Sequence, residues 1–79
     1  MTLTDDQRRA LQLLLDAGLS GCTESIMLAH GFKTELLAGL LHEGLASAAP
    51  ETIRAGGRPM EVVRMRITEA GQRVLARRP

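Results

Sequence analysis

The chain has almost no aromatic side chains: Phe32 is the only one among 79 residues, and tryptophan and tyrosine are absent. Proteins that bind single-stranded nucleic acid stack bases on several aromatic rings, so the composition disfavours that mode of binding. The only cysteine, Cys22, excludes an internal disulfide. It fits a reducing compartment, where a lone cysteine is most often a small buried hydrophobe.

Long apolar runs and export signals are also missing. No apolar run approaches the roughly 18 residues that a membrane-spanning helix needs. The N-terminus, Met1 to Asp6, has neither the basic stretch nor the apolar stretch of a signal peptide. We therefore expect a cytoplasmic protein without a membrane partner, folded as a single domain over residues 1–79.

Motifs for catalysis and metal binding are absent as well. The sequence has no glycine-rich phosphate loop after a predicted strand, and no nucleophile elbow. Cys22, His30 and His42 are the conceivable metal ligands, but their spacing matches no compact zinc pattern. We expect neither an enzyme, nor a metal site, nor a cofactor.

Charge is plentiful but unevenly distributed. Residues 1–50 hold six acidic groups against three basic ones, whereas residues 51–79 hold seven arginines against three glutamates. Nine of the ten basic residues are arginine, which favours planar contacts with phosphate or carboxylate. The competing explanation for this excess of arginine is a coding bias that supplies arginine throughout the chain.

The N-terminal half predicts three helices. The first begins at a capping box formed by Thr4 and Gln7 and buries a stripe of Leu11, Leu14 and Leu15. The second is short, is capped by Thr23 or Ser20, and ends at Gly31 in the left-handed position that follows many helices. The third runs from about residue 33 to 43 and buries four leucines: Leu36, Leu37, Leu40 and Leu41.

The C-terminal half predicts a β-hairpin and a closing helix. Gly56-Gly57 between β-prone segments is typical of a tight turn. Residues 60–67 alternate, which places Val63, Met65 and Ile67 on a core face and Val62, Arg64 and Arg66 on the other. The segment Ala46–Pro50 is a weak or edge strand at best, because it ends at a proline. Thr68 caps the last helix.

The register of this hairpin has two alternatives. A two-residue turn at Gly56-Gly57 would place Ile53 opposite Met60, on the arginine face. A longer, bulged loop would move Ile53 to the core face.

This order of elements resembles a winged helix-turn-helix domain, as in small bacterial winged-helix transcriptional regulators. The resemblance implies an α+β, mostly α, fold with three helices, a two-stranded hairpin wing and a C-terminal helix. The residues that carry it are Gly31-Phe32 at the turn, the leucines of the third helix, Gly44-Leu45 at its exit, Gly56-Gly57 at the wing tip, and Ile67-Thr68-Glu69-Ala70-Gly71.

The resemblance implies a DNA-binding module or transcriptional regulator that binds double-stranded DNA. The third helix would enter the major groove and the wing would contact the backbone or the minor groove. The implied contacts are Lys33, Thr34, Ala38 and His42 on the helix, Arg54 and Arg58 at the wing, and Arg64 and Arg66 if their face is open.

The third helix is short and carries one lysine against two glutamates on its exposed face, so backbone contacts by the wing would dominate. The alternative is a protein–protein interaction module on the same fold that does not bind DNA. Its partner would be a second copy or another protein, held on the first and third helices.

Overall fold

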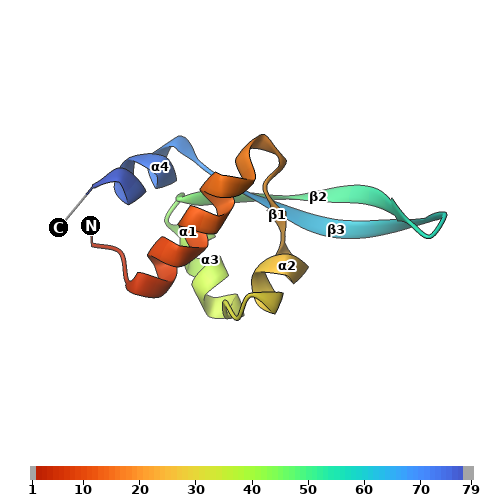
Figure 1. The fold of residues 1–79 in the computed structure, drawn as a ribbon, viewed down its shortest axis with the longest axis horizontal. Coiled ribbons are helices and arrows are strands. Elements are labelled where there is room, and N and C mark those ends of the chain that lie inside the picture. Colours follow the sequence, from red (N-terminus) through yellow and green to blue (C-terminus); the bar gives the residue numbers. More distant parts are fainter. Residues whose placement is uncertain (1, 78–79) are drawn as a thin grey trace.

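Four α-helices, one 3-10 turn and a three-stranded antiparallel sheet form residues 2–77, which this computed structural model describes. The helices gather at the base of the sheet, and the β2–β3 hairpin projects away from them (Figure 1). The expected α+β class is confirmed. In chain order the elements are α1 (Asp5–Ala17), η1 (Gly18–Ser20), β1 (Cys22–Thr23), α2 (Glu24–Ala29), α3 (Thr34–His42), β2 (Ala46–Ala55), β3 (Arg58–Ile67) and α4 (Glu69–Ala76).

Threonine side chains start three of the four α-helices. The Thr4 hydroxyl accepts the N–H of Gln7 at 3.1 Å, and the Gln7 side chain accepts the N–H of Thr4 at 2.9 Å, which completes the predicted capping box. Thr23, and not Ser20, caps α2. Thr68 caps α4 as expected. Each hydroxyl satisfies a backbone N–H that has no partner within its own helix.

Glycines end α2 and α3 in the expected way. Gly31 has a φ of +93° and Gly44 a φ of +75°, a region that glycine adopts without steric cost. The chain then returns to the core, because the next residues, Phe32 and Leu45, are both buried.

The sheet has a strand that the sequence did not predict. β1 pairs with β3 at Cys22–Met65 and Thr23–Arg64, so the strand order is β1-β3-β2. The expected two-stranded hairpin is therefore part of a three-stranded sheet. A segment of only two residues has no periodicity to detect, and it becomes a strand only because β3 provides its partner.

The strand after α3 is also much longer than expected. β2 contains ten residues, runs through Pro50, and forms an edge of the sheet. Pro50 pairs with Val63 and Pro59 pairs with Arg54, four rungs of the hairpin apart. A proline has no N–H to donate, so both residues occupy the non-hydrogen-bonded type of pair and face the outer edges.

The turn settles the register of the hairpin. Gly56 and Gly57 form a two-residue turn between the paired residues Ala55 and Arg58, and Ile53 lies opposite Met60. The first of the two predicted registers is therefore correct. Because directly paired residues share a face, Ile53 lies on the face of Arg64 and Arg66.

The core lies between the helices and the base of the sheet. Its largest fully buried side chains are Leu11, Leu14, Met27, Leu40 and Met65. The burial of Met65 confirms the predicted core face of β3 near its base.

Three residues that were expected to be buried lie at the surface. Leu15, Leu41 and Val63 are 39%, 37% and 38% exposed. Leu15 and Leu41 directly follow Leu14 and Leu40, which take the fully buried positions on their helices. Val63 lies on the part of β3 that extends beyond the pairing with β1.

The segment Thr68–Gly71 joins the sheet to α4 through a set of close contacts. The Thr68 hydroxyl donates to the Gly44 carbonyl at 2.6 Å and accepts the Gly71 N–H at 3.0 Å. The Thr68 N–H donates to the Leu45 carbonyl at 3.1 Å. A Cβ at Gly71 would collide with that Leu45 carbonyl oxygen. The motif thus fixes α4 against the exit of α3.

Candidate nucleic-acid interface

The predicted reading face of α3 is exposed. Lys33 is the N-cap of the helix. Thr34, Ala38 and His42 lie within the helix and are spaced about one turn apart from each other. All four residues are at the surface. The buried side of the helix is formed by Leu37 and Leu40. A threonine and a histidine can hydrogen-bond to bases or phosphates, but Ala38 offers only a methyl group. This face therefore has little capacity to read a base sequence.

The two predicted wing arginines lie at the far end of the hairpin, on opposite faces. Arg54 pairs with Pro59 and Arg58 pairs with Ala55, and adjacent rungs of a hairpin point to opposite sides. Arg54 Nη1 approaches the Gly57 carbonyl oxygen at 3.4 Å, across the turn. The Arg58 side chain forms no hydrogen bond with any residue within 2–77. A ligand on one face of the hairpin would therefore meet only one of them.

Arg64 is held by the protein itself. Its Nε donates to Glu51 Oε2 at 2.9 Å, and its Nη1 donates to the Ser20 carbonyl at 2.9 Å. Its side chain is only 19% exposed. A phosphate would have to compete with both contacts, so Arg64 is a structural residue of the hairpin base.

Arg66 is held in a similar way. Its Nε donates to the Leu19 carbonyl at 2.7 Å. Together with Arg64 it fixes η1 against the sheet and borders an open polar hollow. The face of these two arginines is only partly open, because η1 lies against it.

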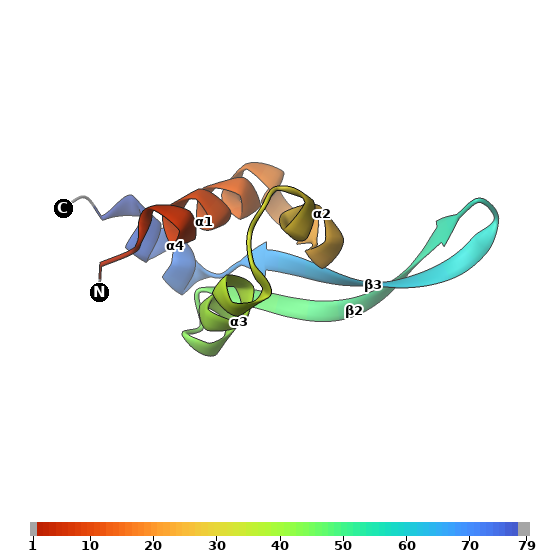
Figure 2. The ribbon, with the colours of Figure 1, turned by 90° about the horizontal axis from the view of Figure 1, so that it is seen from below.

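The two parts of the predicted interface are separated along the molecule. The principal extents are 47 × 22 × 20 Å, and the hairpin forms much of the longest one. Figure 2 shows α3 at the base of the hairpin and the Gly56-Gly57 turn at its opposite end. Lys33 and the wing arginines therefore do not form one compact patch.

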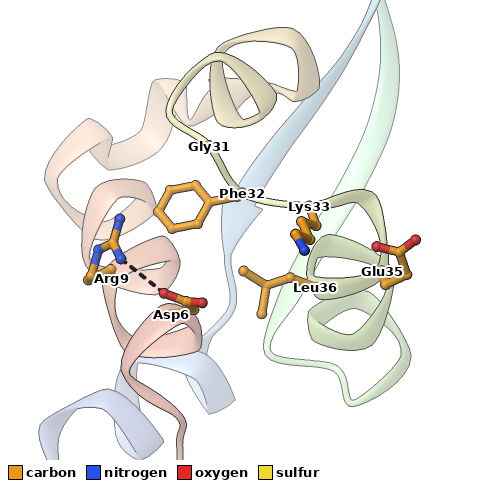
Figure 3. Close-up of a pocket in the computed structure, with 7 residues that line it drawn as sticks. All are labelled: Asp6, Arg9, Gly31, Phe32, Lys33, Glu35 and Leu36. Atoms are coloured by element: carbon orange, nitrogen blue, oxygen red, sulfur yellow. Dashed lines mark hydrogen bonds and ion pairs between the residues drawn. The ribbon is translucent and has the colours of Figure 1, made fainter.

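A small hollow lies beside Lys33, between α1 and the segment that leads into α3 (Figure 3). Its volume is about 180 Å³, which is below the roughly 300 Å³ where small-molecule sites begin. The Arg9 guanidinium lies 5.4 Å from the centre of the Phe32 ring and 2.9 Å from Asp6 Oδ1. Glu35 also lines the hollow. Its walls therefore carry two cations and two carboxylates, so the hollow favours neither an anionic nor a cationic ligand.

Three further observations apply to residues 2–77. Within this range, no group of three or more His, Cys, Asp or Glu side chains is placed to hold a metal ion. Cys22 is buried, whereas His30 and His42 are exposed. None of the helices in the described part combines the length and the apolar character that crossing a bilayer would require.

Sequence reasoning missed the loop that the arginines hold. Leu19, in η1, is 93% exposed, while its own carbonyl accepts from Arg66. Gly18 and Gly21 flank this turn with φ near +60°, and a Cβ at Gly21 would collide with the Met65 carbonyl oxygen. The signal in the sequence was the pair of glycines, Gly18 and Gly21, because a glycine allows its backbone to lie close to another backbone.

Comparison with protein-family models, with curated proteins and with solved structures finds no match to this chain.

Proposed function

We propose that this chain is a winged helix-turn-helix module that binds double-stranded DNA mainly through its hairpin. The observation that carries the proposal is the order of elements. Two short helices are joined by the four residues His30–Lys33, with Gly31 among them, and a long hairpin and a closing helix follow. A short turn that contains glycine is typical of the helix-turn-helix.

The hairpin is the stronger half of the proposed interface. The tip consists of Gly56 and Gly57, which have no side chains, so it is narrow, and nothing lies within 4 Å of either Cβ position; Arg54 and Arg58 extend from the two faces beside it. The minor groove is about 6 Å wide and has a phosphate backbone on each side. A narrow tip inserted edge-on can therefore offer one guanidinium to each backbone.

Sequence discrimination in this proposal is weak. Phosphate contacts orient a protein on the duplex without reading its bases. The polar candidates for base contacts are Lys33, Thr34 and His42, with exposed Glu35 and Glu43 beside them. We therefore expect similar affinity for unrelated duplexes and a strong dependence on salt.

The test is a titration of a fluorescent duplex at several salt concentrations. Removal of Arg54 or Arg58 by substitution with alanine should weaken binding to all duplexes alike. Each substitution should also lower the salt slope by about one, since each arginine releases about one counterion. The matched control is Arg73→Ala, because Arg73 lies on α4 at the other end of the molecule and pairs with Glu69 at 2.7 Å. Absence of binding at low salt, or an equal loss in Arg73→Ala, would contradict the proposal.

One observation favours the second candidate, a protein-interaction module. A leucine that is 93% exposed on a turn fixed by two arginines is available as an apolar anchor for another protein. In that case Leu19→Ser would abolish a protein contact, while the duplex titration would show no binding.

A further inference from the structure

The outer edge of β3 is open near the tip of the hairpin. β1 pairs with β3 only at Arg64 and Met65, so within the described residues no third strand pairs with the segment 58–63. Pro59 lies on this edge, at the second rung from the turn, and is exposed. An exposed proline therefore occupies the outer end of an uncovered edge.

The ring of Pro59 points away from the partner strand. In a hairpin with a two-residue turn, the pair that closes the turn, Ala55–Arg58, is hydrogen-bonded, and the next pair, Arg54–Pro59, is not. The backbone nitrogen of Pro59 therefore faces outward from β3. Because the pyrrolidine ring is attached at that nitrogen, in the place of the hydrogen, a rigid apolar group projects beyond the edge of the ribbon.

The two wing arginines lie beside Pro59 on the two faces of the ribbon. Arg54 is its direct partner and shares its face, whereas Arg58 precedes it along β3 and lies on the other face. When this edge enters a minor groove, each arginine faces one phosphate backbone and the ring of Pro59 faces the floor of the groove, where the base pairs are stacked. The tip thus presents an apolar group between two cations.

We propose that Pro59 is a wedge that enters between two base pairs from the minor groove, partly unstacks them and bends the duplex. This inference rests on the proposed function and specifies the kind of DNA that the hairpin binds. Proline is among the side chains that minor-groove proteins insert in this way, and such insertions kink the duplex by roughly 20–90°. The preferred partner is a duplex with a pyrimidine–purine step, because these steps are the most easily unstacked. Nearly all duplexes of mixed sequence contain such steps, so similar affinity for unrelated sequences is still expected.

Glu61 limits how far the ribbon enters the groove. It is the next residue of the Pro59 face along β3, pairs with Thr52, and is exposed. Its carboxylate would approach the phosphates, and like charges repel. Insertion is therefore confined to the tip, residues 54–59, and Pro59 is the apolar group at the edge of that part.

Pro50 provides a matched comparison within the same hairpin. It also occupies a non-hydrogen-bonded pair, opposite Val63, and is exposed on the outer edge of β2. A proline at such an edge prevents pairing with a further strand, and this role accounts for both residues. Only Pro59, however, lies at the tip with a wing arginine on each side.

The test is energy transfer between dyes at the two ends of a short duplex with one central TA step. Saturation with the wild-type chain should raise the transfer, because a bend brings the ends together. Pro59→Ala should still bind through Arg54 and Arg58 but should leave the transfer unchanged, whereas the control Pro50→Ala should bend the duplex as the wild type does. A duplex with one all-purine strand has no pyrimidine–purine step, so the wild type should bind it about tenfold more weakly.

The outcomes separate this inference from the proposed function. Binding without a change in transfer, or the same bend with Pro59→Ala, would overturn the wedge and leave DNA binding by the arginines standing. Equal affinity of the wild type for the two duplexes would also count against it. Absence of binding to either duplex at low salt would contradict both proposals. Circular dichroism identifies a variant that has failed to fold, and the comparison of the two duplexes needs only the wild-type chain.

Discussion

The helical body and the outer hairpin of this protein are built in contrasting ways. The five largest fully buried side chains of the protein all lie in the body, and four of them come from helices. The outer hairpin, from Pro50 to Val63, has no fully buried residue and is joined chiefly by the pairing of β2 with β3. Apolar burial is the dominant favourable term in folding. The body therefore sets the stability of the fold, and the outer hairpin contributes little to it.

The largest effect should come from the centre of the body. Leu40→Ala empties a site that is 0% exposed and should lower the free energy of unfolding by about 2–5 kcal/mol. Urea denaturation followed by circular dichroism measures the change. The neighbour Leu41, 37% exposed, is the matched control, and its substitution with alanine should cost clearly less. Equal losses at the two positions would show that the body is not packed as described.

A smaller effect is expected where α4 meets the exit of α3. Gly71→Ala should destabilise the protein by about 1–3 kcal/mol, because the added Cβ meets the Leu45 carbonyl oxygen and the Ile67 side chain. Gly39→Ala in α3 is the control. Its Cβ meets nothing within 4 Å, so the better helix propensity of alanine should stabilise by about 0.5–1 kcal/mol. Opposite signs in thermal unfolding would support the close approach, and a stabilising Gly71→Ala would refute it.

The smallest effect is expected in the outer hairpin. Met60→Thr should change the free energy of unfolding of the monomer by no more than about 0.5 kcal/mol, because the side chain is half exposed and the new residue suits a strand. The measurement is made at a low protein concentration, where association does not contribute. A loss comparable to that of Leu40→Ala would remove the distinction between the two regions.

Much of the helical body follows from short segments of the sequence. The capping box of Thr4 and Gln7, the Thr68 cap and the glycine at Gly31 were predicted, because each depends on residues within one helical turn. The Gly56-Gly57 turn was predicted for the same reason. The sequence left two registers open, and the structure selects the first of them, with a two-residue turn and Ile53 opposite Met60.

The candidate site was less predictable. The sequence placed Arg54 and Arg58 together at a tip, but the register points them to opposite faces. It also left Arg64 and Arg66 available for phosphates, whereas they hold the carbonyls of Ser20 and Leu19. These contacts join residues more than 40 positions apart, and no local pattern predicts them.

The sequence by itself thus determined where helices begin and end and where the hairpin turns, because hydrogen bonds and φ angles within a few residues suffice for these features. Only the tertiary structure decided which leucines are buried, that Cys22 and Thr23 form a strand, and that Arg64 and Arg66 are held by other parts of the chain. Burial, strand pairing and charge pairing depend on the neighbours that the fold brings from distant parts of the chain.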